Sequence, residues 1–76
     1  MDEQERGYVA KKFLEHPLVV EVFASIEESI HAEWERATTT EQRDELWYTL
    51  KGALRFKEQM ELLTETAEFN KTLEGI

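Results

Sequence analysis

Glu28 and His31 have the clearest metal-ligand spacing in this sequence. The Glu-x-x-His pattern supplies carboxylate and imidazole ligands in di-iron four-helix bundles, and a dimer of helical hairpins would carry it twice. On a helical projection, however, Glu28 lies nearly opposite the apolar stripe and His31 lies at its border. Glu27, His31 and Glu35 form a straighter ridge with i,i+4 spacing, which is usual for a solvated polar face. We therefore expect no metal site and no cofactor.

Residues that could act as nucleophiles or as general bases are few. Ser25 and Ser29 lie inside a helical pattern, without a nucleophile elbow or a Gly-rich phosphate loop. His16 precedes Pro17 and has no evident catalytic partner. Catalysis needs convergent groups around a cavity, which two helical arms offer poorly. We expect a protein that is not an enzyme and has no catalytic residues.

Basic and aromatic side chains could hold a small anionic ligand between subunits. Trp47 has Arg43 and Lys51 one helical turn away on either side, so the three could form a cation–π stack or receive an anionic group. The full set of candidates for an anionic ligand is Tyr8, Lys11, Lys12, Arg43 and Lys51.

The composition argues against several classes of function. The 76 residues carry a formal net charge of −8, and their nine Lys and Arg are scattered among 17 Asp and Glu. Direct binding to nucleic acid or an anionic membrane requires a basic surface, so we expect neither. No apolar run approaches the roughly 20 residues of a membrane span, and the acidic residues 1–5 are unlike the start of a signal peptide. These features predict a cytoplasmic protein.

Hydrophobic periodicity predicts an all-α fold in a single domain, residues 1–76. Strand-type alternation is absent, and only one proline and three glycines occur. The residue before a proline resists the α conformation, so the sequence His16-Pro17 predicts a break between two helices. Threonines 38–40 supply N-cap hydroxyls for a further helix, with Glu41 or Gln42 completing a capping box. The helices are expected at about residues 3–14, 17–37 and 40–73.

Charged residues are arranged symmetrically about Thr39. Residues equidistant from a short turn lie opposite each other in antiparallel helices. The pattern therefore predicts an antiparallel, coiled-coil-like helical hairpin, whose first arm is broken at His16-Pro17. Each exposed pair would contribute only about 0.2 to 1 kcal/mol, so the pairs indicate alignment rather than stability. The expected pairs are Glu35–Arg43, Glu27–Lys51, Glu21–Lys57, Lys12–Glu65 and Lys11–Glu68.

The last predicted helix has more apolar surface than one partner helix can cover. A heptad seam runs from Leu46 to Asn70, and a second apolar flank accompanies its first half. A chain this short buries a small share of its surface, so we expect it to self-associate into a helical bundle. The candidate interface residues are Trp47, Leu50, Leu54, Phe56 and Met60.

Two segments resemble small uncharacterised helical-hairpin proteins of tailed bacteriophages. They are Pro17-Leu18 with Phe23-x-x-Ile26-x-x-x-Ile30-x-x-x-Trp34, and Gln42-Arg43-Asp44-Glu45-Leu46-Trp47-x-x-Leu50-Lys51. The resemblance covers roughly residues 13 to 65. It implies a phage origin and a place among head or packaging genes, and it brings no catalytic or binding residues. The turn departs from the family pattern because Thr38-Thr39-Thr40 contains no acidic residue.

These observations together predict a non-enzymatic, acidic, homo-oligomeric interaction or assembly protein, encoded by a phage and located in the host cytoplasm. One alternative is an inhibitor whose acidic turn end occupies the basic groove of a host defence enzyme that binds nucleic acid. Such binding would weaken steeply with salt. The other alternative is a protein that sequesters a small anionic ligand at a subunit interface.

Overall fold

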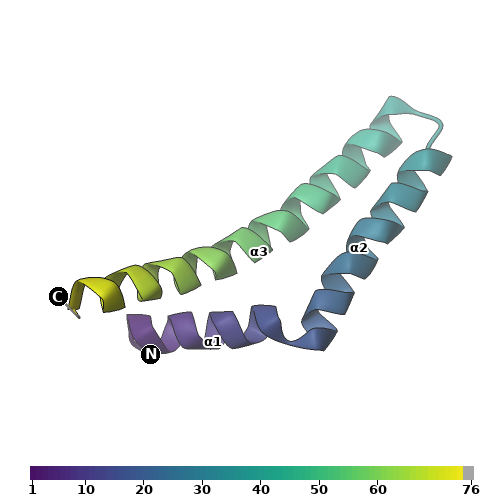
Figure 1. Ribbon diagram of the computed structural model, residues 1–76. Coiled ribbons are helices and arrows are strands. Elements are labelled where there is room, and N and C mark those ends of the chain that lie inside the picture. Colours follow the sequence, from purple (N-terminus) through teal and green to yellow (C-terminus); the bar gives the residue numbers. More distant parts are fainter. Residues whose placement is uncertain (75–76) are drawn as a thin grey trace.

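The chain folds into three α-helices, with no strand among the residues described. The structure is a computed structural model that describes residues 1–74 and the side chains of residues 1–70. The helices are α1 (Glu3–Glu15), α2 (Pro17–Arg36) and α3 (Thr40–Glu74). In Figure 1, α2 lies beside the first part of α3, and α1 lies beside its C-terminal part. The predicted all-α class is confirmed, and each helix ends within one residue of its expected range.

The break between α1 and α2 is a single residue, His16. Its φ of −62° and ψ of 126° are extended, as expected for a residue before proline. The His16 backbone N–H donates to the carbonyl oxygen of Phe13 at 3.2 Å and so closes α1. Its Nδ1 accepts a hydrogen bond from the backbone N–H of Leu18 at 3.1 Å and so caps α2. His16 therefore has a structural role at the bend that Figure 1 shows.

A capping box starts α3. The Thr39 hydroxyl accepts a hydrogen bond from the backbone N–H of Gln42 at 3.2 Å, and the Gln42 side-chain oxygen accepts one from the backbone N–H of Thr38 at 3.0 Å. These reciprocal contacts satisfy donors that the first turn of a helix leaves unpaired. Of the two partners that the sequence left open, the structure uses Gln42.

We expect Thr39→Ala to lower the free energy of unfolding by about 0.5 to 2 kcal/mol, because the first turn of α3 loses its cap. Chemical denaturation followed by circular dichroism would measure the change. Thr40→Ala is the control, since the Thr40 hydroxyl makes no hydrogen bond among the described residues. An equal loss of stability in both variants would contradict the capping role.

α1 packs more closely on α3 than α2 does. Gly7 of α1 lies directly against Ala67 of α3, and Ala10 is also buried in this contact region of small residues. The side-chain amide of Gln4 donates to the carbonyl oxygen of Ala67 at 2.9 Å. A further hydrogen bond joins Asn70 to Glu3. Small residues therefore let these two helices approach each other closely.

α2 makes a looser contact with α3. Among the described residues, Ile30 is the one large hydrophobic side chain that is buried, with 6% of its surface exposed. Near the bend, the rings of Phe13 and Phe23 each contact Phe56, with centroids 5.9 and 6.3 Å apart. The contact of α2 thus depends on one buried isoleucine and on partly exposed rings.

The molecule is elongated and exposes much of its surface. It measures 56 × 23 × 20 Å, and its radius of gyration of 16.5 Å compares with about 11 Å for a compact chain of this length. Its accessible surface is 6210 Å², against about 4,900 Å² for a compact monomer of this mass. The fold by itself therefore leaves an unusually large area uncovered.

Candidate interaction surfaces

The structure divides the five predicted interface residues between two sides of α3. Trp47 and Phe56 are separated by two and a half helical turns, which places them on opposite sides of the helix. Leu50 is half-buried and lies with Trp47, whereas Leu54 is exposed about two turns beyond Trp47. Met60 is half-buried farther along α3. The predicted residues therefore do not form one continuous patch.

One surface is a hollow near the turn, which we call the turn-end hollow. Its volume is about 240 Å³, and it is lined by Ile30, His31, Trp34, Trp47 and Leu50. The two indoles are 40% and 53% exposed, respectively. Both tryptophans therefore contribute to the surface of the molecule.

Arg43 packs against the turn-end hollow in a way that the sequence did not predict. Its guanidinium lies 5.7 Å from the centroid of the Trp34 ring. The predicted stack of Arg43, Trp47 and Lys51 is therefore wrong for Arg43, and so is the predicted ion pair between Glu35 and Arg43. A guanidinium over an indole keeps its attraction to the ring while its charged edge stays in water.

The second surface is a larger hollow at the bend between α1 and α2, which we call the bend hollow. Its volume is about 430 Å³. All eight side chains around it are apolar, and they come from all three helices. The lining residues are Phe13, Leu18, Val19, Val22, Phe23, Ile26, Ala53 and Phe56.

Sequence reasoning missed the importance of Leu18 and Val22 in the bend hollow. Both residues are exposed on α2, Val22 at 47% and Leu18 at 58%. The break at His16-Pro17 was the available signal. A change of direction at His16 separates the start of α2 from α3. Part of the apolar stripe of α2 is therefore left uncovered.

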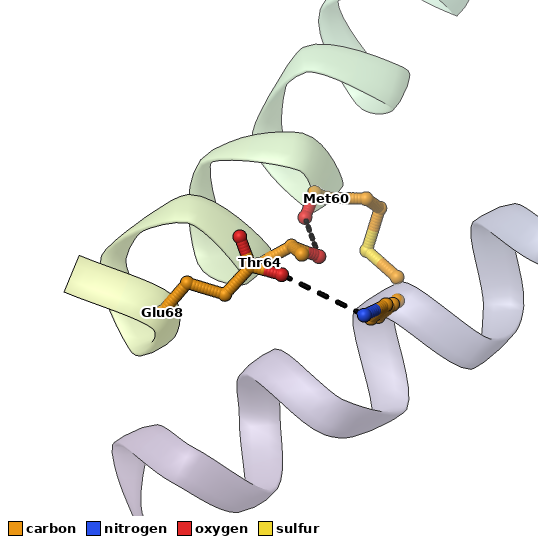
Figure 2. A network of polar contacts seen from close by, with 4 residues as sticks. Met60, Thr64 and Glu68 are labelled. Carbon is orange, nitrogen blue, oxygen red and sulfur yellow. Dashed lines mark hydrogen bonds and ion pairs between the residues drawn. The ribbon is translucent and has the colours of Figure 1, made fainter. Parts of the chain in front are cut away.

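Of the predicted charge pairs, one forms among the described residues. The Lys11 Nζ lies 3.7 Å from a carboxylate oxygen of Glu68. Figure 2 shows Glu68 reaching across from α3 toward α1, beside the hydrogen bond that the Thr64 hydroxyl donates to the carbonyl oxygen of Met60 at 3.2 Å. Both partners of the ion pair are largely exposed, so this contact contributes little to stability.

The remaining predicted ion pairs are not formed, because their cations find other partners or stay in solvent. Lys57 lies 5.8 Å from the centroid of the Phe23 ring, and Lys12 lies 5.5 Å from that of Tyr8. The glutamates of these pairs are exposed: Glu21, Glu27, Glu35 and Glu65. The predicted antiparallel alignment of the arms is visible in Figure 1, but it is not made by ion pairs.

The candidates for an anionic ligand are not gathered in one site within the chain. Tyr8, Lys11 and Lys12 lie on α1, whereas Arg43 and Lys51 lie near the turn end of α3 (Figure 1). A hollow of about 200 Å³ includes Tyr8 and Lys11 in its lining. The carboxylate of Glu68 also lines that hollow and pairs with Lys11. This carboxylate makes the hollow a poor site for an anion.

The residues considered for metal binding or catalysis are also separate. Glu28, Ser25 and Ser29 are exposed, and His31 lines the turn-end hollow. The described residues include no cluster of three or more His, Cys, Asp or Glu that could hold a metal ion. No arrangement of a nucleophile, a base and an orienting group is seen there.

Comparison with known proteins finds no matching family model, no matching curated protein and no matching solved structure. Within the described part of the chain, no helix is both long and apolar enough to cross a membrane.

Proposed function

We propose that this protein is a non-enzymatic interaction protein that self-associates and acts in the assembly of a larger protein structure. The observation that carries the proposal is the uncovered apolar surface. Only Ala10, Ile30 and Ala67 are buried hydrophobic residues among those described. Leucine, valine, phenylalanine and tryptophan side chains are left largely in contact with water.

The size of the exposed surface supports self-association. The chain exposes about 1,300 Å² more than a compact monomer of its mass would. Large hydrophobic side chains of all three helices, among them Val9, Leu18 and Phe56, lie on this surface. A chain that buries so little of its own surface gains stability when another chain covers that surface.

The charge of the chain limits the surfaces that can be used. Each copy carries a formal net charge of −8, so two copies repel one another wherever their carboxylates meet. Contact through the apolar hollows avoids this repulsion. The resemblance of residues 13 to 65 to proteins of tailed phages supports phage particle assembly as the setting.

We expect native mass spectrometry and light scattering at micromolar concentration to give the mass of two or more chains. The thermal midpoint should rise with protein concentration, because association stabilises the folded state by mass action. Raised salt should preserve or strengthen the association, since it screens the repulsion between acidic surfaces. A single-chain mass with cooperative, concentration-independent unfolding would overturn the proposal.

A further inference from the structure

We infer that the bend hollow is the self-association face and that its occupant is the same face of a second copy of this chain, related by a two-fold axis. The inference rests on the proposed self-association and specifies its surface. The turn-end hollow, on the other side of α3, then stays outside this contact.

The chemistry of the bend hollow fits a permanent apolar contact. Its lining contains no polar side chain, and Phe56, which closes it on the α3 side, is 51% exposed. Leu18 and Val22 on α2 are similarly exposed. Burial of apolar surface contributes about 25 cal/mol per Å², so covering these three side chains is strongly favourable.

An uncharged ridge of α2 adjoins the bend hollow. Leu18, Val22, Ser25 and Ser29 follow one another at spacings of four, three and four residues, so they form one ridge on this side of the helix. The serines are small as well as uncharged. A second copy that approaches along this ridge meets these uncharged side chains first, while the carboxylates of Glu21 and Glu28 lie beside the ridge.

The position of the acidic residues favours an antiparallel two-fold arrangement over a parallel one. On the same side as the bend hollow, Glu33 and Glu45 lie near the turn, where they line a separate hollow. A two-fold axis that passes between the bend hollows, perpendicular to the 56 Å long dimension of the molecule, directs the two turn ends away from each other. A parallel pair would bring the acidic turn ends together.

The exposed area matches what one additional copy would cover. A stable interface of standard size buries about 800 Å² on each partner. The excess of about 1,300 Å² per chain counts the polar and apolar surface of the whole molecule, and it is larger than that requirement. A two-fold contact uses the same patch on both copies, so one patch is sufficient.

Several features favour a second copy over a different protein as the occupant. The described part of the chain has few buried hydrophobic residues, so its exposed apolar surface must be covered as soon as the chain folds. Another copy is the partner that is always present at that moment. Obligate homodimers often have no stable folded monomer, and their stability depends on protomer concentration.

Two valines of α2 give a matched test. Val20 and Val22 are 55% and 47% exposed, and a separation of two residues places them on opposite sides of the helix. Val22 lines the bend hollow, whereas Val20 lies outside it. We expect Val22→Glu to raise the dissociation constant at least 100-fold in light scattering and sedimentation. Val20→Glu should change it less than threefold.

The two proposals fail in different ways. If the unmodified chain has the mass of one copy, self-association itself is wrong. If the unmodified chain is oligomeric and Val22→Glu leaves its mass unchanged, self-association stands and the bend hollow is not its face. Loss of association in Val20→Glu or Trp47→Glu, with Val22→Glu unaffected, would assign the contact to the other side.

A second measurement applies if Val22→Glu does not fold. The chain has no cysteine, so Val22→Cys and Val20→Cys would each carry a single thiol. Under native conditions we expect the thiol in Val22→Cys to react with a maleimide at least tenfold more slowly than the thiol in Val20→Cys. The protection should disappear on dilution to the monomer. Equal rates in an oligomeric sample would overturn the inference.

Discussion

Gly7→Ala is expected to destabilise the protein by about 1 to 3 kcal/mol, the usual range for overpacking of a close contact. At an open helical position the same substitution has the opposite effect on stability, because alanine is favoured there over glycine by about 1 kcal/mol. A Cβ at residue 7 would overlap the Cβ of Ala67 and lie 3.0 Å from the carbonyl oxygen of Leu63. Neither atom belongs to the far end of a flexible side chain. Consequently α1 must move away from α3.

Denaturation followed by circular dichroism, at one fixed protein concentration, would measure the effect of Gly7→Ala. Gly52→Ala is the matched control, because a Cβ at residue 52 has no neighbouring atom within 4 Å. We expect this control to be as stable as the unmodified protein or up to about 1 kcal/mol more stable. Equal stabilisation by both substitutions would show that α1 does not approach α3 as closely as described.

A double substitution tests whether the contact with Ala67 causes the destabilisation expected for Gly7→Ala. Ala67→Gly removes the Cβ that the new methyl group would meet, so Gly7→Ala should be less destabilising in that background. The two changes should be non-additive by about 0.5 kcal/mol or more, as is found for residues in direct contact. Additive effects would indicate that the carbonyl oxygen of Leu63, rather than Ala67, limits the space.

Ile30→Ala is expected to have the largest effect of any single truncation, a loss of about 2 to 5 kcal/mol. Ile30 is the large hydrophobic side chain that α2 buries against α3, and the neighbouring Trp34 and Trp47 are exposed. Removing its outer carbons leaves a space that these partly exposed neighbours cannot fill well. For a domain of this size the loss is a large share of the total stability.

Thermal unfolding at fixed concentration would measure the effect of Ile30→Ala. Tryptophan fluorescence adds a local signal, since Trp34 and Trp47 line the same hollow as Ile30. Val20→Ala is the control, because Val20 is exposed and its truncation should cost far less. A cost below about 1 kcal/mol for Ile30→Ala would mean that the turn end has no core of its own.

The helices and their ends could be predicted from the sequence because the signals are local. Pro17 fixes a helix start and disfavours the α conformation at His16, whatever the rest of the chain does. The hydroxyl of Thr39 can cap a helix from within its own turn. The hydrophobic period likewise needs no information beyond each segment. These local signals explain why the three helices begin and end close to the predicted residues.

Partners across the helices were harder to predict. The charge pairs about Thr39 gave the direction of the arms, yet Arg43 and Lys57 pack over aromatic rings instead of pairing with their expected glutamates. An exposed ion pair contributes too little free energy to choose between such partners. Packing of rings in the strip between the helices decides the matter.

The sequence by itself determined three helices, the break at His16 and an acidic chain with more apolar surface than it can bury. Only the tertiary structure decided where that surface is left uncovered. The reason is that Gly7 and Ala67, far apart in the sequence, allow α1 to approach α3 closely, while the bend at His16 turns α2 onto a different path. Trp47 and Phe56 thereby line separate hollows, although one helix carries both.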